Sequence, residues 1–428
     1  MTLPTGNSLG LMRILKLTPS TEKKLLDARH VRDEDAARVA ARIVGDVRRG
    51  GDAALFAWTN KLDHISLTAS SVWIERKEMR AAQRRVDRKF IAAIKHAAAN
   101  VRTIAKRQIP REWSVETERG VRVQQLVRPL DSVGCYIPGG RNSLVSTLVM
   151  TVVPAQTAGV RGIVVVCPKP GDEILAAASL LGVERVGKIG GAQAIGAMAY
   201  GTKSVPRVDK IVGPGSRFVT AAKQLVSHDC AIDLPAGPTE AMVLAVGGNA
   251  RWVAADLVAQ AEHASDAASF LVTTSLKFAR EVRAEVASQI RELPPDSPAA
   301  ASLQKAGAIL LAPSMQAAID FVNRFAPEHL SLPEDDGTLL KKVRACGTVF
   351  TGPLTAQALG DYATGSNHVL PTRGWARARG GLSTADFVRC ITVQSVNRGG
   401  FGRLGGDVAL LASAEGLPGH TAAVAARR

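Results

Sequence analysis

The sequence predicts an α/β protein with two Rossmann-like parallel-sheet units, a cleft between them, a helical N-terminal region and extended terminal segments. From about residue 131 onward, short runs rich in β-branched residues alternate with alanine-rich stretches of helical length. Apolar strands that alternate with helices indicate a parallel sheet covered on both faces. The 428 residues suffice for two or three domains, and a 4% share of aromatic residues suits closely packed helices and strands.

Two successive series of such elements divide this part of the chain. In the first series we expect strands at 133–138, 162–167, 185–189 and 210–212, with helices within 146–159, 172–182, 193–200 and 217–227. In the second we expect strands at 241–246, 270–274, 309–312 and 348–351, with helices within 250–263 and 276–293. Because ligands of such folds bind beyond the carboxyl ends of the strands, the cleft between the two units is the expected site.

The two ends of the chain differ from this pattern. Residues 1–30 form an expected arm that needs a partner surface, and 33–108 is mostly helical. Asp33 or Asp35 can cap a helix that ends near Gly50-Gly51, and a second helix at 90–107 is stopped by Pro110. Past about 380 the chain is rich in glycine and arginine, with a short helix around 407–415. This tail either folds back on its own cleft or completes another subunit's.

Composition excludes several classes of protein. The net charge of +16 is spread along the chain without a long basic run or interleaved aromatics, which favours an arginine-rich surface over nucleic-acid binding. No apolar run is long enough for a bilayer, and residues 1–10 lack the plan of a secretion signal. The five scattered cysteines contain no Cys-x-x-Cys pair, so we expect reduced thiols and a cytoplasmic protein.

Four of the eight histidines lie in polar segments of the second half of the chain. These are Gln260-Ala261-Glu262-His263, Ala326-Pro327-Glu328-His329, Gly360-Asp361-Tyr362 with Asn367-His368, and Glu415-Gly416-Leu417-Pro418-Gly419-His420. Neutral imidazole binds metal ions and transfers protons near neutral pH. The four segments are therefore predicted to converge on one metal and acid–base site.

Gln260 and His263 are spaced for a shared helix face. They lie three residues apart in a predicted helix, and Asp361 and His420 can add an oxygen and a nitrogen from elsewhere. Such a mixed set suits zinc or manganese and leaves positions open for a substrate. Glutamine is a weak ligand, however, so spacing alone leaves open a solvated Gln260 and a His263 that caps the helix.

Glu328 and His329 are adjacent in a predicted turn after Pro327. A histidine can take a proton from an alcohol as hydride leaves, and a carboxylate can activate a water molecule. The alternative is an exposed polar turn. Gly213-Pro214-Gly215-Ser216 and Gly190-Gly191-Ala192-Gln193 each follow a predicted strand, where backbone N–H groups can hold a phosphate or simply turn the chain. The loop from Asp233 to Glu240, which contains Thr239, lines the cleft or only reverses direction.

Taken together and in order, these motifs resemble the histidinol dehydrogenase family. The resemblance runs from Arg49-Gly50-Gly51-Asp52 almost to the C-terminus and includes Tyr136-Ile137-Pro138-Gly139-Gly140-Arg141, Pro235-Ala236-Gly237-Pro238 and Asn367-His368-Val369-Leu370-Pro371-Thr372. It implies a zinc-dependent, NAD-linked oxidation of L-histidinol through L-histidinaldehyde to L-histidine, the last step of histidine biosynthesis. It also implies a homodimer with exchanged terminal segments and one zinc ion per subunit.

The resemblance also assigns roles to residues. The implied metal ligands are Gln260, His263, Asp361 and His420, with the metal orienting the substrate's imidazole and amino nitrogens. His329 is the implied general base, and Glu328 activates water. The implied substrate contacts are Thr239, Gln260, His263, His329, Asp361, Glu415 and His420, with His368 nearby. The positions that match NAD contacts are Tyr136, Gln193 and Ser216.

Two departures from the family pattern stand out. Ser216 replaces a usual asparagine, which shortens a cofactor contact, and Thr239 replaces a common serine, which adds a methyl group. The implied domains are an arm at 1–30, a metal and catalytic domain at 31–130 with 240–380, an NAD domain at 131–239, and a tail at 381–428 that completes a site. The alternatives are a related zinc and NAD dehydrogenase of another small polar alcohol, or a non-catalytic basic binding protein.

Overall fold

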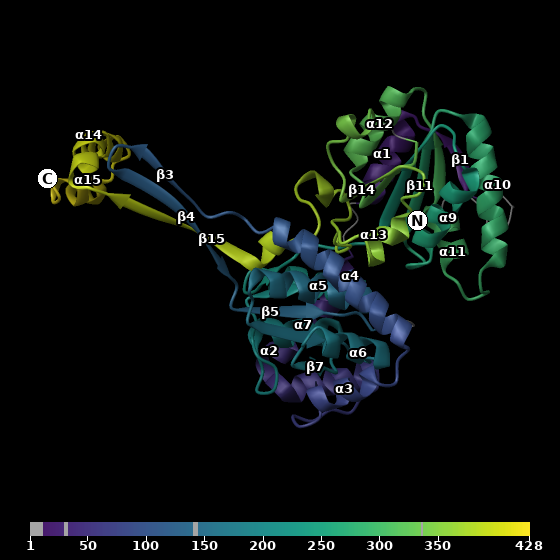
Figure 1. The fold of residues 1–428 in the computed structure, drawn as a ribbon, viewed down its shortest axis with the longest axis horizontal. Helices are drawn as coiled ribbons and strands as arrows, with labels where there is room; N and C mark the ends of the chain where they lie inside the picture. Colours follow the sequence, from purple (N-terminus) through teal and green to yellow (C-terminus); the bar gives the residue numbers. More distant parts are fainter. Residues whose placement is uncertain (1–11, 30–32, 140–143, 335–336) are drawn as a thin grey trace.

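Two six-stranded sheets, each covered by helices, and a projecting three-stranded arm make up the protein (Figure 1). The computed structural model describes residues 12–29, 33–139, 144–334 and 337–428. The predicted α/β class with two parallel-sheet units is confirmed. Each predicted strand is present within two residues of its expected bounds, because all of them are buried apolar runs.

The first sheet has the strand order β2-β7-β6-β5-β8-β9. All neighbours are parallel except β2, which runs antiparallel to β7. Its strands are β2 (Trp73–Glu75), β5 (Ser132–Tyr136), β6 (Gly162–Val166), β7 (Arg185–Gly187), β8 (Lys210–Val212) and β9 (Ala231–Ile232). The helices between them are α5 (Val145–Ala158), α6 (Asp172–Leu180), α7 (Gly191–Tyr200) and α8 (Arg217–Val226).

The N-terminal helices pack on this first sheet unit. They are α2 (Glu34–Asp63), α3 (Arg76–Gln83) and α4 (Arg88–Arg107). α2 contacts α7 and α8, α3 contacts α6, and α4 contacts α5. The predicted grouping of 31–130 with 240–380 therefore needs correction, because the apolar stripe of α2 shares a core with Ile195 and Met198. Asp33 caps α2 as predicted, and the predicted helix end near Gly50-Gly51 is confirmed, because Gly51 with φ of 53° and ψ of -134° breaks the helical geometry there. A second helical segment follows this kink and ends at Asp63.

The second sheet is parallel throughout, in the order β1-β12-β11-β10-β13-β14. Its strands are β1 (Arg13–Lys16), β10 (Glu240–Leu244), β11 (Ala268–Thr273), β12 (Ala308–Leu311), β13 (His329–Leu332) and β14 (Thr348–Thr351). The helices of this unit are α1 (Pro19–Ala28), α9 (Ala250–Ala261), α10 (Leu276–Glu292), α11 (Ala299–Ala306), α12 (Met315–Phe325) and α13 (Gln357–Tyr362).

The segment predicted as an N-terminal arm is part of this second sheet. β1 pairs with β12 from Arg13 opposite Ala308 to Lys16 opposite Leu311, and Met12 and Leu17 are buried on either side of it. Residues 12–29 therefore belong with 240–380, since their apolar side chains fill the core of that unit. Residues 1–11 lie outside the described part of the chain.

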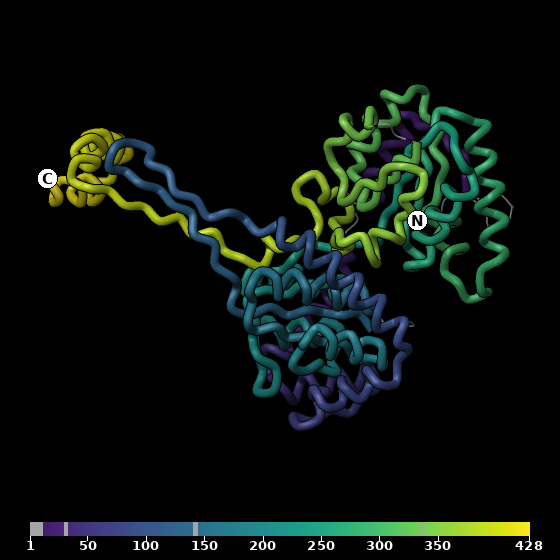
Figure 2. The backbone as a smooth tube through the Cα atoms, in the orientation of Figure 1, coloured from purple at the N-terminus to yellow at the C-terminus, as the bar shows by residue number. Residues whose placement is uncertain are grey.

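A long antiparallel arm carries the C-terminal helices away from both sheets (Figures 1 and 2). It consists of β3 (Trp113–Glu118), β4 (Val121–Pro129) and β15 (Val388–Val396), and it ends in α14 (Arg398–Ala414) and α15 (Pro418–Ala425). β4 lies between β3 and β15, with Val121 opposite Val396 and Pro129 opposite Val388. The predicted helix at 407–415 is confirmed within α14, whereas the strands of the arm were not predicted.

Short 3-10 helices complete the described chain at Leu340–Lys342, Trp375–Arg377 and Thr384–Phe387. Across the described residues, no helix combines the length and apolarity that a membrane span requires.

Candidate active site

Glu328 and His329 lie buried at the amino end of β13. The preceding helix α12 ends at Ala326, whose φ of 50° turns the chain sharply into Pro327. His329 opens β13 and lies opposite Ala241 of β10, and the exposed fractions of Glu328 and His329 are only 6% and 4%. The alternative of an exposed polar turn is therefore excluded.

A hydrogen-bond chain joins Glu328 to Gln260 through Thr239. The Thr239 hydroxyl donates to Glu328 Oε2 at 2.5 Å and accepts from Gln260 Nε2 at 2.6 Å. The backbone N–H of Glu240 also donates to Glu328 Oε2, at 2.8 Å. Burial raises the pKa of Glu328 to about 7, against the opposing effects of His329 and these hydrogen bonds. The carboxyl group therefore exchanges protons near neutral pH.

The backbone orients the imidazole of His329. Its Nδ1 lies 3.2 Å from the carbonyl oxygen of Glu240, and a carbonyl only accepts, so Nδ1 carries the hydrogen. Nε2 is the second ring nitrogen; it lies 3.7 Å from Asp361 Oδ1 and has no hydrogen-bond partner within the described structure. Burial lowers the pKa of His329, but the nearby carboxylates of Glu328 and Asp361 outweigh it and raise the pKa.

The predicted metal ligands Gln260, His263 and Asp361 come from two neighbouring helices. Gln260 is buried in the last turn of α9, and His263 follows two residues beyond the end of that helix, where it is exposed. Asp361 lies on α13. Burial raises the pKa of its carboxyl group, but His329, His368 and His263 together lower it below the usual value. Three imidazoles thus lie near the Asp361 carboxylate.

His368 links the two sheet units beside this site. Its Nδ1 lies 2.8 Å from the carbonyl oxygen of Asp361, and its Nε2 lies 3.3 Å from the hydroxyl of Thr147 on α5. Burial lowers its pKa. The prediction that His368 lies near the site is confirmed. Its two contacts indicate that it holds α13 against α5 of the first sheet unit.

The remaining predicted residues, Glu415 and His420, are not brought to this site within one chain. Both are exposed, and they lie on the helices at the far end of the arm, well away from α13 (Figure 1). In the part of the chain that the structure describes, no group of three or more His, Cys, Asp or Glu residues gathers closely enough to hold a metal ion.

The three predicted cofactor positions gather at the carboxyl ends of strands in the first sheet. Tyr136 ends β5, and its hydroxyl accepts from the N–H of Gly191 at 3.1 Å. Gln193 in α7 donates to Asp63 at 2.9 Å, and its buried Oε1 has no partner in the described structure. Ser216 is exposed at the N-cap of α8. Parallel sheets bind ligands at this edge.

Two buried charged residues, Lys223 and Asp233, hold the turn before Ser216, and sequence reasoning assigned neither of them this role. Gly213 has φ of 116°, and a Cβ there would lie 2.2 Å from the Tyr136 carbonyl oxygen, so only glycine fits. Its N–H donates to Asp233 at 2.7 Å, and its carbonyl accepts from Lys223 Nζ at 2.9 Å. Lys223 and Asp233 also form a buried ion pair. Lys223 sits in an apolar helix, and no local signal marks its partner.

Arg29 is a second site residue that sequence reasoning missed. It forms a buried, two-pronged ion pair with Glu240, including Nε to Oε1 at 2.7 Å, and its guanidinium lies 3.7 Å from the ring centre of Phe325. Glu240 supplies the carbonyl that orients His329. Helix α1 therefore anchors the start of β10, 211 residues away in sequence.

The protein has two Rossmann-like sheets, and a buried carboxyl–imidazole pair lies at the amino end of β13 in one of them. This arrangement defines a dehydrogenase built from two sheet units. The chain belongs to the histidinol dehydrogenase family, whose model matches residues 26–428. It is an oxidoreductase of histidine biosynthesis.

Individual relatives agree over nearly the whole chain. Histidinol dehydrogenase of Methanothermobacter thermautotrophicus is 41% identical over 96% of this chain and 97% of its own length. That of Syntrophotalea carbinolica is also 41% identical, over 97% of this chain and 99% of its own. The crystal structure of histidinol dehydrogenase from Elizabethkingia anophelis is 35% identical, covers 99% of each chain and superposes with a TM-score of 0.92.

Proposed function

We propose that this chain oxidises L-histidinol through L-histidinaldehyde to L-histidine, with NAD as hydride acceptor, zinc at the site, and a homodimer as the working unit. The observation that carries the proposal is the buried assembly in which Thr239 bridges Glu328 and Gln260 while His329 faces Asp361. We place the reaction in the cytoplasm, as the cysteine usage predicts.

His329 is the proposed base of both oxidations. Its Nδ1–H is engaged by the Glu240 carbonyl, so Nε2 is the atom that accepts a proton. In the first oxidation, Nε2 takes the hydroxyl proton of the alcohol while the carbon-bound hydride passes to NAD. In the second, it takes a hydroxyl proton of the hydrated aldehyde while a second hydride leaves. Two NADH molecules are therefore formed for each L-histidinol.

Glu328 is the proposed group that hydrates the aldehyde. A carboxylate takes a proton from water as the water oxygen attacks the carbonyl carbon. Burial raises the pKa of Glu328 to about 7, which strengthens it as a base relative to an exposed glutamate. The hydrogen bonds from Thr239 and the Glu240 N–H hold the ionised form in place.

The donor set fits a zinc ion. The Gln260 amide nitrogen is engaged by Thr239, so the amide oxygen is the atom left to ligate, and Asp361 and His263 supply an oxygen and a nitrogen. When bound, the ion would hold the imidazole and amino nitrogens of the substrate and so orient the alcohol toward His329. The fourth ligand of the proposed set is His420.

A second copy of the chain is the proposed source of His420 and Glu415. Both residues lie at the end of the arm, far from the α13 of their own chain (Figure 2). The arm and its helices also expose large apolar side chains, among them Leu410 at 72%, Leu411 at 65% and Trp113 at 46% exposure. Exchange of arms between two copies would bury these surfaces and complete the substrate and metal contacts of each site.

NAD is the proposed ligand of the carboxyl edge of the first sheet. Tyr136, Gln193 and Ser216 lie there after β5, β7 and β8, beside the tight turn at Gly213. Backbone N–H groups at the start of α8 can contact a phosphate. Ser216 reaches less far than the asparagine that is usual in the family, so we propose a weaker cofactor contact at this position.

The stoichiometry of NADH tests the proposal. Purified protein is supplied with a limiting amount of L-histidinol, excess NAD and zinc, and NADH is counted by absorbance. Two NADH per L-histidinol, lost on chelation and restored by zinc, would support the assignment. A yield of one, or turnover of another small alcohol but not of L-histidinol, would contradict it. His329→Ala should stop turnover and leave the zinc content near that of the wild type.

A further inference from the structure

A pocket of about 460 Å³ opens at the edge of the second sheet opposite to Glu328 and His329. It lies beyond the carboxyl ends of β10, β13 and β14, whereas the candidate active site lies at the amino end of β13. Its volume is within the range of small-molecule sites, roughly 300–1,000 Å³. The carboxyl edge of a parallel sheet is also where α/β folds bind ligands. None of the residues assigned above to substrate, metal or NAD lines this pocket.

The walls of the pocket are apolar and aromatic, with two acidic groups and no basic group among the described lining residues. Trp252 of α9 lines the pocket and is 48% exposed, and the buried Phe350 of β14 also lines it. The charged residues of the lining are Asp256 and Glu334. This electrostatic setting disfavours phosphates and carboxylates, and it favours a ligand that carries positive charge.

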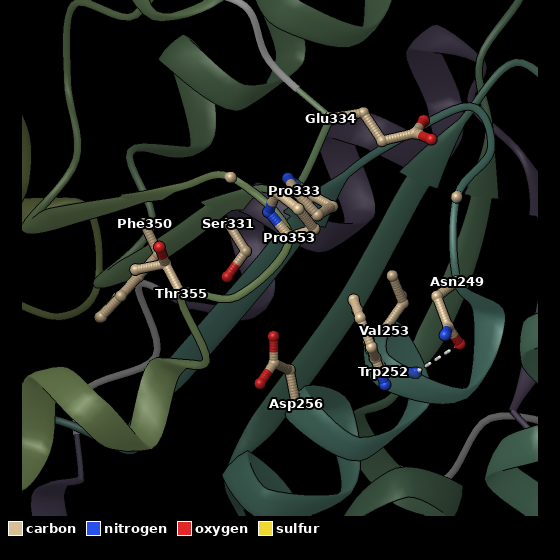
Figure 3. Close-up of a pocket in the computed structure, with 12 residues that line it drawn as sticks. Asn249, Trp252, Val253, Asp256, Ser331, Pro333, Glu334, Phe350, Pro353 and Thr355 are labelled. Carbon is tan, nitrogen blue, oxygen red and sulfur yellow. Dashed lines mark hydrogen bonds between the residues drawn. The ribbon is translucent and has the colours of Figure 1, made fainter.

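The carboxylate of Asp256 points into the pocket. Figure 3 shows it extending from α9 toward Ser331 and Thr355, while the Glu334 carboxylate turns away toward the loop that precedes α9. The hydrogen bond to Asp256 within the described structure comes from the Gln357 N–H, at a long 3.4 Å. Glu334 is instead occupied by the Gly247 N–H at 3.1 Å. Asp256 therefore has accepting capacity left for a ligand inside the pocket.

Phe350 separates this pocket from the catalytic pair. Its ring stacks on the imidazole of His329 with the ring centres 6.0 Å apart, and it is 5% exposed. α13 closes over the same ring, because a Cβ at Gly360 would lie 2.6 Å from Phe350. A ligand held by Asp256 is thus divided from substrate by one side chain and does not compete for the same space.

We propose that this pocket is a second small-molecule site that takes a compact organic cation: an ammonium group bound by Asp256, joined to a flat apolar body that lies against Trp252. An ammonium group donates up to three hydrogen bonds, and the Asp256 carboxylate has accepting capacity left for them, whereas the Ser331 hydroxyl already accepts from Gln357 Nε2 at 2.9 Å. The Trp252 face adds a cation–π contact. The site is a property of the second sheet unit and holds whatever reaction the catalytic pair performs.

Calorimetric titration with 2-phenylethylammonium tests the proposal on the full-length protein, with 3-phenylpropanoate as an anion of similar size. We expect the cation to bind at least about tenfold more tightly than the anion, because the Asp256 charge attracts one and repels the other. Asp256→Asn should weaken cation binding by about tenfold or more, and Trp252→Ala should weaken it without touching the charge. Thermal unfolding of each variant verifies that it is folded.

Glu334→Gln is the matched control. It removes a carboxylate that lines the same pocket but faces away from Asp256. The affinity for the cation should change by less than about threefold. Asp361→Asn, which removes a carboxylate from the candidate active site, should leave cation binding unchanged, which distinguishes the two sites. Equal binding to wild type and to folded Asp256→Asn, weaker binding to folded Asp361→Asn than to folded Asp256→Asn, or no binding at millimolar probe would each overturn the proposal.

Discussion

Lys223 and Asp233 form a fully buried ion pair directly beneath the turn at Gly213. Their side chains are 2% and 0% exposed, and both also bond to the backbone of Gly213, one through its carbonyl and the other through its N–H. The charge of each residue is thus compensated by the other and by this turn, and Asp233 Oδ1 also accepts from the Leu234 N–H at 2.6 Å. The pair fixes the backbone that precedes Ser216, at the proposed NAD edge of the first sheet.

Lys223→Met should therefore destabilise the protein and weaken NAD binding together. Removal of one partner leaves Asp233 charged and buried, which costs about 3–5 kcal/mol of unfolding free energy. The KM for NAD should rise more than kcat falls, because the turn and not the catalytic pair is disturbed. Denaturant unfolding and steady-state kinetics measure both. Arg85→Met, which breaks an exposed pair with Asp172, should cost less than about 1 kcal/mol, and equal losses in the two variants would contradict the assignment.

Thr239→Val should move the pH dependence of turnover upward. The Thr239 hydroxyl bond lowers the pKa of Glu328, which burial holds at about 7, so its loss raises that pKa further. Activity that needs the ionised carboxylate rises with pH through this pKa, and the rise then occurs at higher pH. The measurement is kcat/KM for L-histidinaldehyde from pH 5.5 to 9.

Thr239→Ser is the control for this prediction, because serine keeps the hydroxyl. Its pH profile should coincide with that of the wild type. A profile of Thr239→Val that also coincides would show that the hydrogen bond does not tune Glu328.

Ser216→Asn should strengthen the binding of NAD. The longer amide side chain can reach a cofactor atom that serine does not, since Ser216 is exposed at the start of α8 and has no side-chain capping bond there. We expect the KM for NAD to fall by about threefold to tenfold, the effect of one added hydrogen bond, with kcat unchanged. An unchanged or higher KM would place Ser216 outside the cofactor contacts.

Asp256→Asn should stabilise the protein at neutral pH. Burial raises the pKa of Asp256 from 3.8 to about 6, so the folded state binds its proton more tightly than the unfolded state does. Ionising Asp256 in the folded state lowers the free energy of unfolding. This loss is complete above about pH 6 and absent below pH 3.8. The variant should gain about 2 kcal/mol near pH 7.5 and almost nothing near pH 4. Urea unfolding at the two pH values measures this; an equal gain at both would contradict the pKa shift.

Hybrid assembly tests whether His420 acts in the partner's site. His329→Ala and His420→Ala chains, each inactive alone, are unfolded together and refolded. If arms are exchanged, a hybrid dimer has one site with both changes and one intact site. Random pairing makes about half of the dimers hybrids, so about a quarter of wild-type activity returns. If His420 serves its own chain, both sites of the hybrid are defective and no activity returns.

The strands that were predicted most accurately from the sequence are those whose residues are buried in the core. β5 and β10 are strands in the structure as predicted, and their apolar residues are almost all buried. β13 was missed, since only Leu330-Ser331-Leu332 follows the turn and the strand begins at His329 itself. The arm strands were missed because they are largely exposed, so they lack the buried apolar runs on which the strand predictions rested.

Part of the candidate site was predictable, because some of its residues lie close together in the sequence. Gln260 with His263, and Glu328 with His329, are local pairs whose spacing is visible in the sequence, and the family resemblance assigned their roles. Arg29 and Lys223 were not predictable, because each acts through a partner that folding brings near. Arg29 meets Glu240 across 211 residues, and the charge of a single arginine gives no sign of that contact.

The arm also determines when the protein can finish folding. β4 spans residues 121–129, but its partner β15 spans 388–396, so most of the chain is synthesised between them. Until the last tenth of the polypeptide leaves the ribosome, β4 keeps one edge without its partner strand, and an open strand edge promotes aggregation. A prematurely terminated chain would have both sheets and the buried Glu328–His329 pair, yet it could not close the arm. Closure of this ribbon therefore distinguishes a chain that includes β15 from a shorter fragment.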